Sequence, residues 1–178
     1  MAALGPDVCI QHRDPGAPIR GFLERARWLA RLAGDTGAQL AINGRLDVAL
    51  LLDAHLHLPV DAPRPEEVRP SLTAGRWITA AAHSEPELAG ARGCDAVLLS
   101  PVFTPGSKPG DRRPPLGPEG FERLARRAAP TPSYALGGMT VGRLESLHFC
   151  AGAVVQSAIL TAPDPGAVAL AFLLRLKG

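Results

Sequence analysis

The sequence has few aromatic residues, few cysteines and no long apolar run. Tryptophan, tyrosine and phenylalanine make up 4% of the chain, so no base-stacking surface for nucleic acid is evident. The three cysteines, Cys9, Cys94 and Cys150, are odd in number and widely spaced, which argues against both a disulfide framework and a zinc knuckle. No apolar run reaches the roughly 18 residues needed to span a bilayer, and the N-terminus lacks the pattern of a signal peptide. These absences predict a cytoplasmic protein that binds neither membrane nor nucleic acid.

The charge is low and evenly spread. Charged residues make up 20% of the 178 residues, the net charge is +2, and the arginines form no cluster along the chain. Such a balance gives no reason to expect an acidic polymer as partner. The hydrophobic content of 46% is enough for a sizeable core, and the length suits one domain over residues 1–178.

Short apolar runs alternate with amphipathic segments along the chain. We expect helices at residues 22–33, 65–73, 85–92, 118–129, 141–149 and 165–176, and at most two helical turns at 46–52. Glycine-containing turns lead from a helix into a strand at residues 36–42, 92–98 and 150–155. This alternation implies a parallel sheet. The expected strands are residues 8–12, 39–42, 55–58, 77–81, 96–99, 133–136 and 153–155.

An open doubly wound sheet and a closed (β/α) barrel both fit this alternation. No Gly-x-Gly-x-x-Gly turn follows the first expected strand, which favours the barrel. A closed barrel has eight strands, of which seven are recognisable in this sequence. The missing strand should be the first, because only seven residues precede Val8. We therefore expect an α/β fold of the TIM-barrel type that lacks its first strand.

Glycines and polar residues follow the expected strands, where (β/α) barrels place their active sites. The pair Gly137-Gly138 follows a buried strand, and two glycines let the backbone come close to a ligand. Their N–H groups and the start of the next helix would favour an anion. Gln156 and Ser157 follow the last strand, and the last two loops of a barrel often bind phosphate. A turn that needs glycine only for its conformation is the alternative interpretation.

Two cationic and two oxygen-bearing side chains also follow strands. Arg13 and Lys108 could neutralise a phosphate, although solvated surface positions explain them equally well. Asn43 and Asp61 offer oxygen ligands suited to Mg²⁺, and Asp61 could equally be a turn residue. These four residues are candidates whose value depends on their meeting at one end of the sheet.

Of the histidines in or near the expected strands, His55, His57 and His83 are candidates for chemistry. His55 and His57 share one face of a strand, yet no third ligand with zinc spacing accompanies them. We therefore expect buried, hydrogen-bonded histidines rather than a metal site. His83 could act as a general base, but a structural histidine at a strand end is the favoured interpretation.

The order of these motifs resembles the thiamine phosphate synthase/TenI family from Cys9 to Ile159. The resemblance implies a (β/α)8 barrel acting on small phosphorylated substrates. Synthase members join hydroxymethylpyrimidine diphosphate to thiazole phosphate with Mg²⁺, through a pyrimidine carbocation, and release diphosphate. The segments that carry the resemblance are residues 11–14 (Gln-His-Arg-Asp), 42–49, 57–61, 82–87, 100–108, 136–140 and 157–159.

The resemblance also implies a role for each matching residue. Arg13 and Lys108 would be catalytic and would face the pyrimidine diphosphate together with Gln11 and Asn43, and Asp61 would hold Mg²⁺. The residues implied at the thiazole phosphate are Ser107, Gly137, Gly138, Gln156 and Ser157.

Four positions depart from the family pattern. Pro15 replaces a lysine of the first motif, Gly44 replaces an aspartate that binds metal, and Ala81 replaces a serine. Pro101 stands at about the place of the catalytic histidine of TenI-type tautomerases. We expect a synthase with a weakened Mg²⁺ site. The alternative is a catalytically impaired paralogue that binds a thiazole or thiamine phosphate as carrier or regulator. A third hypothesis is an interaction protein that forms a homodimer through exposed strand edges.

Overall fold

The computed structural model describes residues 2–104 and 113–177. Strands and helices alternate along the chain, and seven strands occur in the described residues, each within one residue of its expected bounds. Contacts divide the chain into two compact units, Met1–Ala80 (unit 1) and Ala81–Gly178 (unit 2). The expected α/β fold with seven recognisable strands is confirmed, whereas the single domain over residues 1–178 stays a prediction.

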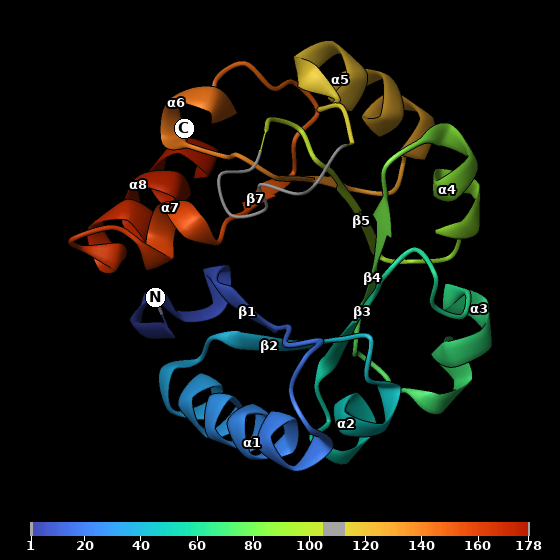
Figure 1. Ribbon diagram of the computed structural model, residues 1–178, viewed down its shortest axis with the longest axis vertical. Coiled ribbons are helices and arrows are strands. Elements are labelled where there is room, and N and C mark those ends of the chain that lie inside the picture. Colours follow the sequence, from blue (N-terminus) through green and yellow to red (C-terminus); the bar gives the residue numbers. More distant parts are fainter. Residues whose placement is uncertain (1, 105–112, 178) are drawn as a thin grey trace. The chain divides into compact units, whose positions relative to one another are not determined.

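Unit 1 contains strands that pair in sequence order, and every pairing is parallel. Figure 1 shows α1 and α2 together on one side of these strands. In chain order the unit comprises η1 (Ala2–Asp7), β1 (Cys9–His12), α1 (Ile19–Thr36), β2 (Gln39–Asn43), α2 (Leu46–Leu51), β3 (His55–Leu58), α3 (Pro65–Val68), η2 (Arg69–Ser71) and the first three residues of β4 (Ile78–Ala82).

The two faces of the unit 1 strands differ in polarity because side chains alternate along a strand. His12 pairs with Ile42, and its ring contacts the Phe22 ring of α1 in a tilted arrangement with 4.1 Å between centroids, so their shared face lies under the helix. That face carries the buried apolar side chains of Leu40, Ile42, Leu56, Leu58 and Ile78. The opposite face carries the polar side chains of Gln11, Asn43, His55, His57 and Thr79.

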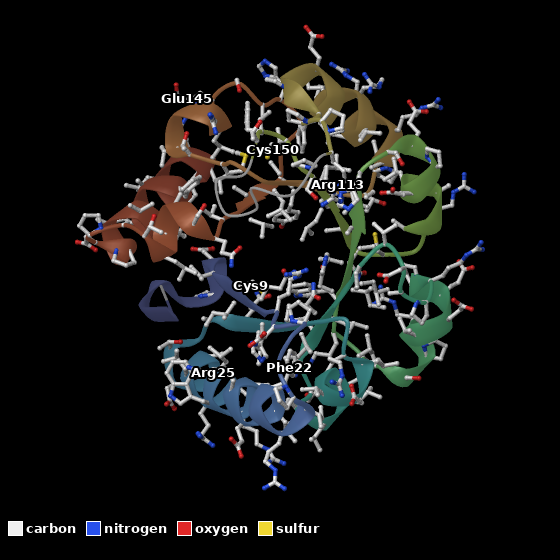
Figure 2. All side chains as sticks on the ribbon, viewed as in Figure 1. Cys9, Phe22, Arg25, Arg113, Glu145 and Cys150 are labelled. Atoms are coloured by element: carbon white, nitrogen blue, oxygen red, sulfur yellow. The ribbon has the colours of Figure 1, made fainter. Side chains whose placement is uncertain are left out.

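Helix α1 packs on the sheet through an apolar stripe. Phe22, which is labelled in Figure 2, is buried together with Ala26 and Ala33. The helix begins at Ile19, three residues before its expected start, because the Pro18 carbonyl already accepts from the amide of Phe22 at 3.0 Å. It ends at Gly37, which has the left-handed φ of 73° expected of a glycine stop.

Unit 2 begins within β4 and continues the same alternation. The amide of Ser100, directly after β5, donates to the carbonyl of Ala82 at 3.2 Å. β5 pairs with β6 and β6 with β7, both in parallel. The elements are α4 (Glu85–Gly90), β5 (Ala96–Leu99), α5 (Gly117–Ala128), β6 (Ser133–Leu136), α6 (Val141–Leu144), β7 (Gly152–Val154), α7 (Ser157–Leu160) and α8 (Pro165–Lys177).

The strands of unit 2 are mostly apolar on both faces. Val97, Leu99 and Ala135 are buried on one face, and Phe121 of α5 is buried as well. On the other face Tyr134 pairs with Gly152 of β7, and a Cβ added to that glycine would lie 2.4 Å from the Tyr134 ring. Unit 2 therefore offers few strand side chains for chemistry.

The prediction of a helix over residues 141–149 is wrong for its second half. α6 ends at Leu144, and the following amides of Ser146 and Leu147 bond to carbonyls three residues back. The hydroxyl of Ser146 also donates to the carbonyl of Arg143 at 2.8 Å. Phe149 then takes a positive φ of 58°, a conformation that ends any helix.

Candidate functional site

A polar row crosses the carboxyl ends of β2, β3 and β4 in unit 1. Asn43 pairs with His57, and His57 pairs with Thr79, so their three side chains share one face. The His57 Nδ1 lies 2.8 Å from the Thr79 hydroxyl. Arg13 directly follows the last residue of β1, His12, which pairs with Ile42. The structure thus places Asn43, His57 and Thr79 in one row, and the positive charge of Arg13 acts on His57.

His57 is neutral in this row at neutral pH. Its side chain is 4% exposed, and burial lowers its pKa to about 4, with the positive charge of Arg13 contributing in the same direction. The expectation of buried, hydrogen-bonded histidines is confirmed for His57 and also for His55, whose Nδ1 accepts from the amide of Trp77 at 3.1 Å. Gln11 lies half-buried on the same face, because it pairs with Ala41, two residues before Asn43.

The turn after β2 is built around Gly44. Its φ is +67°, its N–H donates to the His57 carbonyl at 2.9 Å, and an added Cβ would make only ordinary contact with Pro59 Cγ at 3.5 Å. The guanidinium of Arg45 donates two hydrogen bonds to the Asp47 carboxylate, at 3.1 and 2.7 Å, and lowers the pKa of Asp47. The carboxylate of Asp47 is therefore already occupied by a cation.

Asp61 is exposed in the turn that follows β3. Across residues 2–104 and 113–177, no group of three histidine, cysteine, aspartate or glutamate side chains is arranged to hold a metal. One carboxylate and the amide oxygen of Asn43 suit Mg²⁺ only if most ligands are waters and substrate phosphate oxygens, which is the usual way that Mg²⁺ binds. The role of Asp61 stays a prediction.

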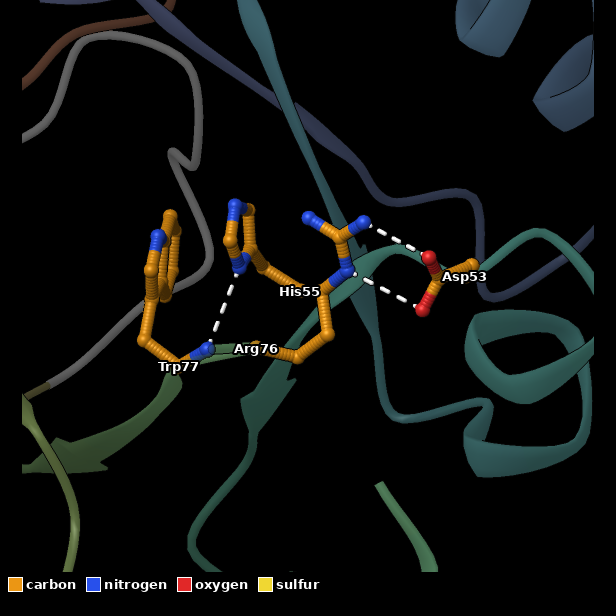
Figure 3. A network of polar contacts seen from close by, with 4 residues as sticks. All are labelled: Asp53, His55, Arg76 and Trp77. Carbon is orange, nitrogen blue, oxygen red and sulfur yellow. Dashed lines mark hydrogen bonds and ion pairs between the residues drawn. The ribbon is translucent and has the colours of Figure 1, made fainter. Parts of the chain in front are cut away.

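A second polar network lies at the opposite, amino ends of β3 and β4 (Figure 3). The guanidinium of Arg76 forms two hydrogen bonds with the Asp53 carboxylate, at 3.0 and 2.6 Å, and lowers the pKa of Asp53 to about 2. Trp77 stacks on His55 with 4.0 Å between ring centroids, and its indole N–H donates to Gln39. Residues at this end of a (β/α) barrel usually serve stability rather than catalysis. No local sequence pattern signals the pairing of residues 53 and 76.

In unit 2 the paired-glycine turn, Gly137-Gly138, lies close against the segment that follows β5. A Cβ added to Gly137 would lie 2.9 Å from Pro101 Cα, and one added to Gly138 would lie 2.7 Å from the Thr104 carbonyl oxygen. Both glycines have positive φ, 98° and 61°. Steric space and backbone conformation therefore both require glycine at these positions.

The carbonyl groups of this turn are both anchored. The Gly137 carbonyl accepts from the amide of Phe103 at 3.1 Å, and the Gly138 carbonyl accepts from Nη1 of Arg143 at 2.5 Å. In a trans peptide the N–H points opposite to the carbonyl, so the amides of Gly138 and Met139 point away from these anchors. Within the described part of the chain neither amide has a hydrogen-bond partner. Two adjacent free N–H groups of this kind can bind an anion.

The helix that follows the turn contributes less than its expected length suggested, because α6 has four residues. The strands before the two predicted phosphate loops are neighbours, since Leu136 pairs with Val154. The Gly137-Gly138 and Gln156-Ser157 segments therefore follow adjacent strands at the same end of the sheet. Gln156 is exposed and Ser157 is half-buried at the start of α7. Ser107 and Lys108 lie outside the described residues, so their roles stay predictions.

His83 supports the segment that carries Pro101. Its Nδ1 lies 2.5 Å from the Ser100 carbonyl oxygen and 3.1 Å from the Ser100 hydroxyl. A carbonyl can only accept, so the Nδ1 of His83 carries a proton and donates it to this carbonyl. The backbone amide of His83 donates to Glu87 at 2.7 Å. These contacts agree with the favoured structural interpretation of His83.

Comparison with known proteins gives a consistent result. A sequence profile described as thiamine monophosphate synthase matches residues 2–159, which fall in both units. The thiamine-phosphate synthase of Solidesulfovibrio magneticus is 36% identical over 172 residues, which are 94% of this chain and 81% of that protein. The thiamine-phosphate synthase of Roseiflexus castenholzii is 34% identical over 171 residues, which are 93% of this chain and 74% of that protein.

A solved structure shows the same fold. The thiamine phosphate pyrophosphorylase from Pyrococcus furiosus superposes with a TM-score of 0.80 and 25% identity, over 99% of this chain and 86% of that one. This likeness confirms the expected TIM-type (β/α) fold class. Within the described residues, no helix combines the length and the apolar character that crossing a bilayer requires.

Proposed function

Because the chain belongs to the thiamine monophosphate synthase family, we propose that it condenses hydroxymethylpyrimidine diphosphate with thiazole phosphate, yielding thiamine phosphate and diphosphate. Family membership implies small phosphorylated substrates. The observation that carries the proposal is the paired-glycine turn, whose two anchored carbonyls leave the amides of Gly138 and Met139 free for an anion.

Unit 2 would hold the thiazole phosphate. The two free amides would donate to its phosphate oxygens, and Gln156 and Ser157, which follow the neighbouring strand, would add side-chain or backbone donors. Gly137 is needed for the close approach of the Pro101 segment. Ser107 completes this set in the proposal, by analogy with the family motif. A phosphate fixed in this way would position the thiazole ring for attack.

Unit 1 would hold the pyrimidine diphosphate. Arg13 offers a planar guanidinium to the departing diphosphate, and Gln11 and Asn43 lie on the same polar face of the strands. Lys108 is the second catalytic cation of the proposal. Stabilising the charge on the leaving diphosphate is the main requirement of a reaction that passes through a carbocation.

Mg²⁺ belongs to this proposal, with Asp61 as its protein carboxylate and the amide oxygen of Asn43 as a further candidate ligand. The ion would supply further neutralisation of the diphosphate charge. Gly44 offers no carboxylate, and the carboxylate of Asp47 is already bound by Arg45. Neither residue therefore adds a free carboxylate to that of Asp61. We therefore expect weak Mg²⁺ binding in the absence of diphosphate and tighter binding in its presence.

The same departures favour a second candidate, a paralogue that binds a thiazole or thiamine phosphate without turnover. Gly44 removes one carboxylate and Pro15 removes one cation, while the paired-glycine turn is fully formed. Phosphate binding would then survive although the chemistry is lost.

One experiment separates the two. Purified protein is incubated with both precursors, with Mg²⁺ or with EDTA, and thiamine phosphate is measured by conversion to fluorescent thiochrome phosphate. A synthase gives Mg²⁺-dependent product that disappears in Arg13→Ala. No product at high enzyme concentration, with thiazole phosphate still binding in calorimetry, would favour the paralogue. Absence of both product and binding would refute the proposal.

A further inference from the structure

We infer that Arg143 is a positioning residue of the phosphate subsite, acting through the Gly138 carbonyl rather than on the ligand. This inference rests on the proposed function of the paired-glycine turn. The guanidinium of Arg143 would fix the peptide between Gly138 and Met139, so that the Met139 N–H faces the bound phosphate.

The contacts of Arg143 converge on one peptide and one ring. Its Nη1 donates to the Gly138 carbonyl at 2.5 Å, and its Cζ lies 4.9 Å from the centroid of the Phe103 ring. The same Phe103 donates its backbone N–H to the Gly137 carbonyl at 3.1 Å. Phe103 thus anchors the first carbonyl directly and, by stacking, supports the side chain that anchors the second.

The backbone of Arg143 is itself fixed. Its N–H donates to the Thr140 hydroxyl at 3.3 Å, and its carbonyl accepts from the Ser146 hydroxyl at 2.8 Å. The side chain therefore starts from a short, capped turn and returns to a residue five positions earlier in the chain. This geometry ties the beginning of α6 back to the glycine turn.

A charged donor on the carbonyl also changes the amide on the other side of the peptide. Hydrogen bonds to charged groups are stronger than neutral ones, and a polarised peptide donates more strongly through its N–H. A glycine pair is flexible, and without the anchor the peptide could rotate and turn its carbonyl toward the ligand. Arg143 would thus improve both the orientation and the donor strength of the Met139 amide.

Arg126 provides a matched control. It lies over the ring of Phe149 at 4.0 Å, is exposed, and belongs to the same unit, but its contact is to a ring and to Glu122 rather than to the glycine turn. An arginine that only covers an aromatic ring should behave as Arg126 does.

The test measures the affinities of the wild type, Arg143→Met, Arg143→Lys and Arg126→Met for thiazole phosphate and for the unphosphorylated thiazole alcohol. We expect Arg143→Met to weaken binding of the phosphate ester roughly tenfold, the loss of one charge-assisted hydrogen bond, and to leave the alcohol unchanged. Arg143→Lys should recover part of the loss, because lysine keeps the charge but not the planar stack. Arg126→Met should bind both ligands as the wild type does.

Equal loss for ester and alcohol would show a merely structural role and overturn the inference, as would wild-type affinity of Arg143→Met. A wild type that does not prefer the ester over the alcohol would instead refute the proposed phosphate site itself. If Arg143→Met does not fold, titration of Arg143→Lys with inorganic phosphate, followed by NMR, decides the question. We expect a smaller shift of the Met139 amide than in the wild type, and an identical shift would overturn the inference.

Discussion

The two units differ in the kind of chemical group that they offer for binding. In unit 1 the candidate groups are side chains on one face of the strands, with Asn43, His57 and Thr79 in a row. In unit 2 the strands are mostly apolar, and the candidate groups are backbone amides at Gly138 and Met139 in a turn after β6. A single substitution can remove a side-chain ligand, whereas a backbone donor is lost only when the local conformation changes.

Two of the departures from the family pattern remove charged groups, whereas the other two, Ala81 and Pro101, lie in unit 2. Gly44 and Pro15, which replace charged residues of the family pattern, both lie in unit 1 and leave the strands intact. The glycine pair of unit 2 cannot change so easily, because an added Cβ at either position would overlap the segment 101–104. Phosphate binding should therefore be more robust than metal-dependent chemistry in this protein.

The largest effect is expected at the backbone site. Gly138→Ala introduces a Cβ 2.7 Å from the Thr104 carbonyl oxygen at a φ of 61°, so the turn must move. We expect affinity for thiazole phosphate to fall about 100-fold or more, measured by calorimetry, since both free amides shift together. Gly142→Ala, where no atom lies within 4 Å of the added Cβ, is the control and should bind normally. Similar affinities of the two variants for thiazole phosphate would refute the proposed backbone site.

The next effect concerns the polar row of unit 1 and has a pH dependence. Burial holds the pKa of His57 at about 4, below the 6.5 of an unperturbed histidine. The unfolded chain therefore binds the proton first, and the free energy of unfolding should fall as the pH drops from 6.5 toward 4. The loss by pH 4.5 should be about 2 to 3 kcal/mol relative to pH 7.5.

Urea unfolding of His57→Gln at both pH values checks this. The variant should lack that part of the pH dependence, whereas His148→Gln, at a position whose side chain is 75% exposed, should keep it. An unchanged pH dependence in His57→Gln would show that another group titrates.

A smaller effect, on the Mg²⁺ dependence, is expected when a family carboxylate is restored to unit 1. At Gly44 an added Cβ has room, and aspartate tolerates positive φ better than most residues. We expect Gly44→Asp to lower the Mg²⁺ concentration for half-maximal activity several-fold, at a stability cost of about 1 kcal/mol. Gly16→Asp adds the same charge at an open position of unit 1. An equal gain in both variants would indicate general electrostatics rather than a metal ligand.

The smallest effect is expected at the amino ends of the strands. Asp53→Asn removes the charge from the ion pair with Arg76 and keeps a residue that tolerates the φ of 48°. The pKa of Asp53 is lowered to about 2, so its contribution to stability is present above the ordinary 3.8 and is lost as the pH falls through 2. Thermal unfolding at pH 7 should show a small decrease, and ligand affinity should not change. Weaker phosphate binding would contradict the separation of this network from the site.

The fold could be predicted because its signals are local. Buried runs such as residues 96–99 and 133–136 are bounded by turn residues, and the strands appear where expected. The glycine pair was identifiable for the same reason. The extent of α6 was not, because the Ser146 hydroxyl and the positive φ of Phe149 end a helix that periodicity alone would continue.

Contacts between residues distant in sequence could not be predicted from local sequence patterns either. Thr79 looks like an ordinary strand residue until it is found beside His57, 22 residues earlier. Arg143 likewise looks like a solvated helix residue, and only the folded turn shows its bond to the Gly138 carbonyl. Such pairings depend on strand register and turn geometry rather than on spacing.

Trp77, which stacks on His55, gives unit 1 a fluorescent reporter inside a described contact. Both tryptophans, Trp28 and Trp77, lie in unit 1, and the only tyrosine, Tyr134, lies in unit 2. Tryptophan emission therefore reports the melting of the first 80 residues alone. Coincidence of that signal with the loss of far-ultraviolet ellipticity would show that both halves unfold as one cooperative body.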